Sequence, residues 1–509
     1  MNLEQTLAAS VIDTLLRENY GRFSDFVISE SEGPVVARVP GVAALPLVAD
    51  GFLADYRVDS SSVTLTLDDV DTLALALSDP RDADGVAAFR TECREALAAM
   101  RLREAHAACS GYEALAARLP HPAYPTWAAR SGWSAKDSLW YGPEHSPTFC
   151  LMWAAVPSAA VTRAGGSAPS WWPGFADVGL PSSLSAGFEL FPVHPLTVPC
   201  LPESVRVAPV PFLEVQPTLS VRTVDVLCAP GTQLKLPLAT STLGSRNKRA
   251  IAPGTLADGA LVRRVLAGLV ARDPRLGRLV LADDGNYAHA GHPYLGYLLR
   301  LLPVSPVPVA ALLAPPVTEE LADGDLLGWF GSYCSLVFGI AVHLFVRYGV
   351  ALESHQQNAA LLSGPALLVK DFDGTLINHE RLAAALGSRT PSPAEFADPR
   401  LLTDSDDDLA NVFITITVHL CAGAIAFGLA DRGRAPLPVL LTVVRDCLVA
   451  VLDLYAGEPA AAQLAARVLE ADRLPGKAMV TAGTLVDKSR TGATDINKYY
   501  GTTGPNYLR

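Results

Sequence analysis

Hydrophobic residues recur every three or four positions in several long stretches of the chain, and this spacing predicts helices. In residues 2–18, for example, Leu3, Leu7, Val11 and Leu15 fall on one helical face. Further helices are predicted at 84–118, 258–272, 318–347, 379–386, 408–431, 436–455 and 459–473. The last third of the chain is therefore expected to be mostly helical.

Two other regions favour strands. Residues 24–78 contain runs with alternating character at 35–39 and 63–67, and residues 145–240 form short apolar runs separated by proline and glycine. The first third is thus predicted to be an α+β domain, and the middle third is predicted to be β-rich. The fold class predicted for the whole chain is α+β.

One stretch, residues 342–375, joins a predicted helix to a predicted hairpin with polar residues at its open end. The helix should stop at Gly349. Asn358 precedes the first strand and Asp371 follows the second, so the two side chains can lie side by side in the hairpin. Amide and carboxylate oxygens suit Mg²⁺ that carries nucleotide phosphates, and protein-kinase-like folds use such a pair. The alternative is an ordinary polar loop.

The segment Asp371-Phe372-Asp373-Gly374-Thr375 also fits the first motif of haloacid-dehalogenase-type phosphatases. In that reading the first aspartate is the nucleophile and the second is the acid/base. That fold needs a later lysine followed by paired acids. Lys477 is present, but nothing after it resembles Gly-Asp-x-x-x-Asp, so the metal and phosphate reading is favoured.

A basic cluster lies in the β-rich region. Ser220 and Arg222 should share one face of a strand, and Lys235 can join them from a neighbouring strand. Between positions 222 and 249 the chain has five basic residues, Arg222, Lys235, Arg246, Lys248 and Arg249, and one acid. Cations interleaved with hydroxyls suit an anion with several carboxylates or phosphates. The alternative is a solvated basic strand edge.

Composition limits the classes of function. The chain has 509 residues, half of them hydrophobic, and a formal net charge of -12, which argues against nucleic acid as the main partner. None of the eight cysteines forms Cys-x-x-Cys, and no secretion signal is evident, so a reduced, cytoplasmic protein is expected. The apolar run 412–430 contains threonines, a histidine and glycines, and it is predicted to be a buried core helix rather than a membrane span.

These motifs resemble the IucA/IucC family, the siderophore synthetases that work without non-ribosomal peptide synthetases. The resemblance runs from about residue 119 to the end. It rests on His121-Pro122, Arg130 and Gly132 of an early loop, Tyr141-x-Pro-Glu144, His194-Pro195, Ser220-x-Arg222-Thr223, Lys235, Thr242, Arg246, Glu353-x-His355-x-Gln357-Asn358, Lys370-Asp371-Phe372-x-Gly374 and Pro475-x-Lys477-Ala478.

The resemblance implies a hand-shaped molecule with a distantly kinase-like palm. The expected parts are a thumb at 1–140, β-rich fingers at 141–317 that bind ATP and the carboxylate, and a palm at 318–509 that carries the Mg²⁺-ATP hairpin. A cytoplasmic homodimer is expected, with no nucleic-acid or membrane partner.

The resemblance also implies a ligase reaction. ATP adenylates a carboxylate, typically of citrate or a citrate derivative, and an amine or hydroxyl nucleophile, polyamine- or amino-acid-like, then displaces AMP. The implied catalytic residues are Arg246, His355, Lys477 and Thr242. The implied ATP-binding residues are Ser220, Arg222, Thr223, Lys235, His355, Gln357, Asn358 and Asp371. The implied magnesium ligands are Asn358 and Asp371, with Glu353 and Asp373 as weaker candidates.

Two other functions stay open at this point. A small-molecule kinase could use the same hairpin and release ADP, although no His-x-Asp base precedes Asn358. A sensor of nucleotide or citrate could bind without turnover. The early loop departs from the family pattern at Tyr124 and Ala128, which stand in place of a histidine and a lysine, and this predicts a carboxylate or nucleophile different from the commonest ones in the family.

Overall fold

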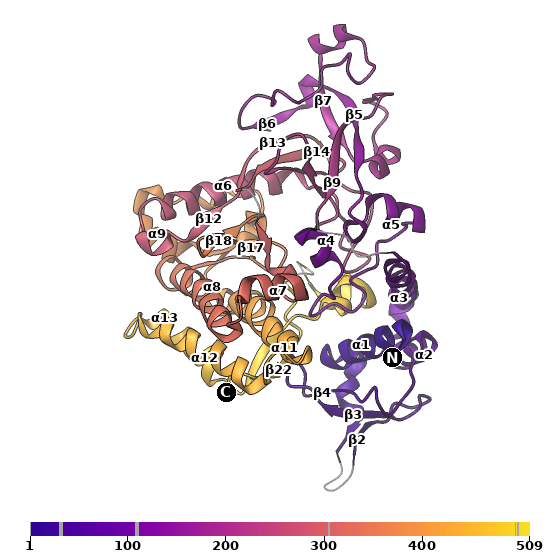
Figure 1. Cartoon of the computed structure of the whole chain (residues 1–509), viewed down its shortest axis with the longest axis vertical. Coiled ribbons are helices and arrows are strands. Elements are labelled where there is room, and N and C mark those ends of the chain that lie inside the picture. Colours follow the sequence, from indigo (N-terminus) through magenta and orange to yellow (C-terminus); the bar gives the residue numbers. More distant parts are fainter. Residues whose placement is uncertain (1, 30–33, 107–110, 304–305, 494, 496–497) are drawn as a thin grey trace.

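The computed structural model describes residues 2–29, 34–106, 111–303, 306–493, 495 and 498–509. The N-terminal elements lie at one end of the long axis and strands of a large sheet at the other (Figure 1). The mainly helical C-terminal elements lie beside them. The chain is a mixed α/β protein, in agreement with the predicted α+β class.

The N-terminal region packs helices on a four-stranded antiparallel sheet with the order β1-β2-β3-β4. The predicted helix at 2–18 is confirmed. The elements are α1 (Leu3–Arg17), β1 (Val27–Ile28), β2 (Val35–Ala37), β3 (Leu45–Ala49), β4 (Tyr56–Val58), α2 (Leu67–Leu77), α3 (Ala83–Glu104), α4 (Tyr112–Ala117) and α5 (Ala135–Tyr141).

The prediction of a strand over 63–67 is wrong, because a helix starts there. Thr66 caps α2 through a capping box with Asp69: each side chain accepts a hydrogen bond from the other residue's backbone N–H. Val70, Leu73 and Leu77 then point to the core at helical spacing. The alternating valine, threonine and leucine residues before the cap are typical of a strand, and they led to the wrong prediction.

The middle of the chain forms a nine-stranded antiparallel sheet, which confirms the predicted β-rich region. Its order is β6-β13-β14-β11-β10-β9-β5-β7, with β8 paired to β5. The strands are β5 (Phe149–Pro157), β6 (Thr162–Ala164), β7 (Phe188–Val193), β8 (Arg206–Val207), β9 (Phe212–Pro217), β10 (Thr223–Val226), β11 (Thr232–Lys235), β13 (Asp283–His292) and β14 (Leu295–Leu301).

A second sheet carries the predicted hairpin. Its order is β12-β18-β17-β15, and two of its strands come from before residue 318. Helix α6 (Pro253–Val270) packs against this region. The strands are β12 (Leu279–Leu281), β15 (Val307–Pro308), β17 (Ala359–Leu362) and β18 (Ala366–Val369); a smaller sheet holds β16 (Val350–Ala351), β19 (Leu376–Asn378) and β20 (Leu402–Thr403).

The C-terminal third is mostly helical, as predicted. Helix α8 stops at Gly349, whose φ of 62° lies in the left-handed region and where any side chain would meet Arg381 and Asn378. The helices are α7 (Pro315–Ala322), α8 (Leu326–Tyr348), α9 (His379–Leu386), α10 (Asp406–Val412), the π-helical η13 (Phe413–Gly423), α11 (Ala424–Asp431), α12 (Leu437–Asp453), α13 (Pro459–Ala465), the π-helical η14 (Ala466–Glu470) and η15 (Thr481–Leu485), and α14 (Lys488–Thr491).

Two helices of the described residues are long and apolar enough to cross a membrane. They span 326–348 and 406–431, but 67% and 89% of their most apolar windows are buried inside the protein. Every residue of η13 is buried. The prediction of a core helix at 412–430 is thereby confirmed. Seven cysteines are free, and Cys109 lies outside the described residues.

The end of the chain returns to the N-terminal region. Strands β21 (Arg473–Gly476) and β22 (Thr502–Pro505) pair with each other, and Val480 and Leu485 belong to the N-terminal hydrophobic core. Glu18, at the end of α1, accepts hydrogen bonds from the backbone N–H groups of residues 480 and 481 at 3.0 and 2.7 Å. The segment around Lys477 is therefore fixed by residues more than 450 positions away.

The half-buried Asp13 makes stability depend on pH. Burial raises the pKa of its carboxyl to about 7, although a hydrogen bond from the N–H of Val58 opposes the shift. A carboxyl whose pKa is higher in the folded state stabilises the fold when protonated, and this contribution disappears as pH rises from about 4 to about 7.

We therefore predict that Asp13→Asn, which keeps the acceptor for Val58, becomes progressively more stable than the wild type over that pH window. The melting temperatures of both proteins between pH 4 and pH 8 measure the effect. Asp446→Asn, on the exposed face of α12, serves as the control. A constant difference between Asp13→Asn and the wild type would contradict the assignment.

Candidate functional site

A cavity of about 410 Å³ lies between the N-terminal loops, the nine-stranded sheet and the hairpin of β17 and β18. It brings together most of the side chains that the sequence singled out. The lining includes Ser220, Arg222, Lys235, Thr242, Glu353, His355, Gln357, Asn358, Asp371, Asp373 and Lys477. Thr223 and Arg246 are not among the lining residues.

Ser220 and Arg222 enter the cavity from a tight turn rather than from a strand, so the strand-face expectation is wrong. The turn joins β9 to β10, and Val221 at its tip has a φ of 65°. The Ser220 hydroxyl accepts a hydrogen bond from the N–H of Thr223 at 3.1 Å. Thr223 thus supports the turn and lies opposite Lys235 in the β10–β11 ladder, which confirms that Lys235 joins the cluster from a neighbouring strand.

Arg249 is a cavity cation that belongs to the predicted basic cluster, although the family motifs gave it no role. Its guanidinium donates to the carbonyl oxygen of Ser220 at 3.2 Å, and its Nε is buried without a hydrogen-bond partner among the described residues. Burial, and then the neighbouring charge of Arg222, lower its pKa to about 9. A buried guanidinium with an unused donor beside a cavity is suited to receive an anion.

Arg246 is not among the residues that line the cavity, and its contact with the substrate stays a prediction. It lies at the tip of the loop 240–249, where its backbone N–H donates to the carbonyl of Gly483 at 3.0 Å. Its guanidinium donates to the carbonyl of Ala482 at 3.1 Å. This residue anchors the loop on the C-terminal segment, and the loop then returns to bring Arg249 to the cavity. Thr242, on the same loop, does line the cavity.

The hairpin has the predicted form. Ala359 faces Val369, so Asn358 pairs with Lys370 and Asp371 follows one position later. The amide nitrogen of Asn358 donates to the carbonyl of Glu353 at 3.2 Å, which leaves its amide oxygen available to a cation. Both Asn358 and Asp371 line the cavity, and an amide oxygen and a carboxylate fit the hard ligands that Mg²⁺ takes together with phosphates and water.

Asp371 lies between two cations. Its Oδ1 is 2.5 Å from Nζ of Lys235 and 2.8 Å from a guanidinium nitrogen of Arg300. Burial alone would raise the pKa of this carboxyl, but the charges of Arg300 and Lys235 outweigh burial and hold the pKa well below its usual range. Asp371 is therefore ionised, as a metal ligand must be.

Three further predicted residues, His355, Glu353 and Lys477, form the opposite wall. Burial lowers the pKa of His355 to about 3, so its ring is neutral; Nδ1 accepts the N–H of Gln357 at 3.3 Å, which leaves Nε2 as the donor. Burial raises the pKa of Glu353, and the positive charge of Lys477 works against this shift. Burial lowers the pKa of Lys477, and the negative charge of Glu353 works against that shift. This wall thus combines a neutral donor with two half-buried side chains of opposite charge.

The substitutions in the early loop affect packing rather than the cavity. Tyr124 is 1% exposed, and its hydroxyl donates to the buried carboxylate of Glu92 at 2.9 Å. Ala128 is also buried in the N-terminal core. Neither lines the cavity, whereas His121 of the same loop does. The structure therefore removes the basis for expecting a different substrate from these two positions.

Three of the nine described residues other than glycine that have a positive φ line the cavity. Val221, Leu243 and Asp371 all have φ between 55° and 65°, and all three are lining residues. Residues other than glycine in this region cost about 1–3 kcal/mol each and persist where the surroundings hold them. The surroundings of the cavity therefore hold these three residues in place.

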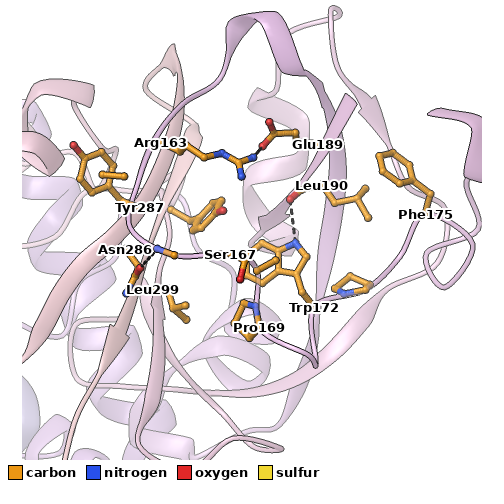
Figure 2. Close-up of a pocket in the computed structure, with 15 residues that line it drawn as sticks. Arg163, Ser167, Pro169, Trp172, Phe175, Glu189, Leu190, Asn286, Tyr287 and Leu299 are labelled. Carbon is orange, nitrogen blue, oxygen red and sulfur yellow. Dashed lines mark hydrogen bonds and ion pairs between the residues drawn. The ribbon is translucent and has the colours of Figure 1, made fainter. Parts of the chain in front are cut away.

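A second cavity of about 230 Å³ lies between the sheet and the loop that follows β6 (Figure 2). Three of its polar side chains already have partners. Arg163 pairs with Glu189, Nε1 of Trp172 donates to the carbonyl of Leu190 at 3.3 Å, and Asn286 accepts the N–H of Gly166 at 2.7 Å. The larger cavity, with its unpaired guanidinium nitrogen, is therefore the better candidate for the active site.

The site gathers cations, an amide oxygen and a carboxylate around one cavity, and comparisons with known proteins show what the chain is similar to. Residues 111–314 match the model of the IucA/IucC family, and residues 328–492 match a model described as ferric iron reductase FhuF-like transporter. By these matches the chain is similar to the IucA/IucC family.

Two curated proteins match parts of the chain. A D-ornithine–citrate ligase of Staphylococcus aureus is 29% identical over 139 residues, or 26% of this chain and 20% of that protein. An uncharacterised protein of Sinorhizobium fredii is 26% identical over 312 residues, or 50% of this chain and 49% of that protein. The matched segments thus span one fifth and about half of the two relatives.

Solved structures match the fold over nearly the whole chain. The petrobactin biosynthesis protein AsbB of Bacillus anthracis aligns with a TM-score of 0.80 and 16% identity, covering 99% of this chain and 95% of that one. Aerobactin synthetase IucC of Klebsiella pneumoniae gives 0.74 and 20%, covering 99% and 98%. ATP-bound IucA of Klebsiella pneumoniae gives 0.74 and 16%, covering 99% of each chain. At these identities the likeness shows the shared fold.

The geometry separates the roles of two arginines from the same loop. Arg249→Ala should weaken binding of tripolyphosphate or citrate by roughly 30-fold, because a charge-assisted hydrogen bond contributes about 2 kcal/mol. Arg246→Ala should change binding less than about threefold, since its guanidinium faces Ala482. Isothermal titration calorimetry on both folded variants measures the difference. A larger loss in Arg246→Ala than in Arg249→Ala would reverse the assignment.

Proposed function

We propose that the protein is an ATP-dependent siderophore synthetase. It adenylates a carboxylate of a citrate-like polycarboxylate and condenses it with an amine or hydroxyl nucleophile, releasing AMP and pyrophosphate. The observation that carries the proposal is that one cavity is lined both by the cations Arg222, Lys235 and Arg249 and by Asn358 and Asp371. The match of residues 111–314 to the IucA/IucC family model and the fold shared with the aerobactin synthetases support it.

The proposal includes the hand-like division of the chain. A thumb at 1–140, fingers at 141–317 and a distantly kinase-like palm at 318–509 place the ATP site where the three meet. The hairpin of β17 and β18, with a polar residue at one strand end and an acid at the other, supports the kinase-like part. The cytoplasmic location and the homodimer stay predictions from the family resemblance.

Residues of this chain fit ATP and Mg²⁺ by their chemistry. Arg222, Lys235 and the neutral Nε2 of His355 would bind phosphate oxygens, and Asn358 and Asp371 would hold the metal, with Glu353 and Asp373 nearby. Bound Mg²⁺ supplies positive charge that neutralises the phosphates. Lys235 is paired with Asp371 in the structure, so its flexible stem would carry the ammonium from the carboxylate to a phosphate when nucleotide binds.

In the first step, an oxygen of the substrate carboxylate attacks the α-phosphorus of ATP, and the bond to the bridging oxygen breaks to release pyrophosphate. A carboxylate is already a nucleophile and needs no base. Two anions must approach each other, so the residues that matter are cations on both sides of the new bond. Arg249 and Lys477 would hold the carboxylate, with Thr242 beside them.

In the second step, the nitrogen or oxygen of the nucleophile attacks the acyl carbon of the adenylate. The bond from that carbon to the AMP oxygen breaks, AMP leaves, and the nucleophile loses one proton. The site needs to hold the nucleophile near the mixed anhydride rather than to supply strong catalysis.

The kinase alternative is less well supported. Phosphoryl transfer to a hydroxyl uses a base close to the acceptor, and the segment Glu353-Ser354-His355-Gln356-Gln357-Asn358 offers no His-x-Asp. The additional cation Arg249 suits a second anion better than a neutral hydroxyl substrate.

We predict that turnover forms AMP and pyrophosphate in equal amounts and depends on both a polycarboxylate and a nucleophile. A screen of citrate, citrate monoamides and dicarboxylates, with hydroxylamine to trap the acyl adenylate, followed by chromatography of the nucleotides, tests this. Asp371→Ala is the matched inactive control. Stoichiometric ADP without AMP for every pair would establish the kinase instead, and nucleotide binding without turnover would favour a sensor.

A further inference from the structure

A buried ion pair lies directly behind the proposed metal ligand. Arg300, in β14, and Asp284, in β13, form a two-point contact at 2.5 and 2.7 Å. Their side chains are 1% and 3% exposed. The sequence gives one indication of this pair, because Arg300 interrupts the apolar run Leu298-Leu299-Arg300-Leu301-Leu302. A charged side chain in such a run is rarely buried unless it has a partner of opposite charge.

The pair holds Asp371 at two points. A guanidinium nitrogen of Arg300 donates to Asp371 Oδ1 at 2.8 Å, and the backbone N–H of Asp371 donates to Asp284 Oδ2 at 3.1 Å. One contact fixes the carboxylate and the other fixes the backbone. Asp371 needs both, because its φ of 58° and ψ of 81° lie in a region that residues other than glycine seldom adopt.

This arrangement is more than packing. A buried ion pair by itself adds little net stability, because the desolvation of both charges offsets their attraction. Here the pair lies in the nine-stranded sheet and also contacts the residue that follows β18 in the second sheet. This residue is Asp371, whose carboxylate faces the cavity. Lys235 has a flexible stem and can leave Asp371, whereas Arg300 is held by two bonds to Asp284.

We propose that Asp284 and Arg300 are positioning residues that fix the carboxylate of Asp371 for the metal–nucleotide complex. The proposal rests on the proposed function, since it assumes that Asp371 is a metal ligand. Arg300 occupies one carboxylate oxygen and directs the other toward the cavity. When Lys235 moves to a phosphate, Arg300 keeps the carboxylate in place, so the ligand is already oriented before the metal arrives.

The test measures metal binding rather than turnover. Arg300→Lys keeps the charge but loses the two-pronged contact, and Asp284→Asn keeps the shape but loses the charge. In the presence of saturating ATP, both should bind Mn²⁺ at least about 10-fold more weakly than the wild type, the effect typical of residues that orient a metal ligand. Binding of metal-free ATP should change less than about threefold. Mn²⁺ electron paramagnetic resonance and calorimetry give the two affinities.

Arg163→Lys is the matched control, because Arg163 pairs with Glu189 in the same sheet but is 54% exposed and remote from Asp371. A purely structural role predicts a lower melting temperature with unchanged Mn²⁺ affinity, and that result would overturn the proposal. Asp284→Asn carries the test if Arg300→Lys does not fold. A wild-type protein that fails to bind Mn²⁺ with ATP would refute the proposed function, and the positioning role with it; equal binding by wild type and variants refutes the positioning role alone.

Discussion

The site depends on the balance of charge around Asp371. The cavity is lined by three cations, Arg222, Lys235 and Arg249. Their positive charges would repel one another if no anion lay at its centre. Asp371 supplies this charge, and it is held from behind by Arg300, which Asp284 neutralises in turn. The same contacts join the nine-stranded sheet to the sheet that carries the hairpin, so the chemistry and the junction between the two sheets rest on one network.

The second constraint is the return of the C-terminal segment to the N-terminal region. Two buried glutamates make this junction. Glu18 accepts the backbone N–H groups of Val480 and Thr481, and Glu92 accepts the hydroxyls of Tyr124 and Thr484. These contacts fix the segment that carries Lys477 and that anchors Arg246. The described residues among the first hundred thus shape the cavity although none of them is among its lining residues.

Much of the site could be predicted from local sequence, because its parts are short and continuous. The hairpin with Asn358 and Asp371 follows from two apolar runs, and the stop at Gly349 follows from helix capping. The sequence did not predict the turn at Ser220–Arg222, because Val221 adopts a left-handed conformation that favours glycine. A valine at this position gives no indication of such a turn. Arg246 and Arg249 are three residues apart on one loop, and only the docking of the loop tip on residues 482–484 decides which one reaches the cavity. Arg300 and Asp284 act through a contact with a strand 70 or more positions away, which spacing alone does not reveal.

The central claim is that a carboxylate oxygen attacks the α-phosphorus of ATP, and an isotope measurement tests it most directly. The polycarboxylate that supports turnover, with citrate tried first, is labelled with ¹⁸O in its carboxylates and turned over with ATP and hydroxylamine. Mass spectrometry of the products then locates the label. The account predicts one ¹⁸O in the phosphate of AMP for each condensation. Label found in orthophosphate, or absent from AMP, would contradict it.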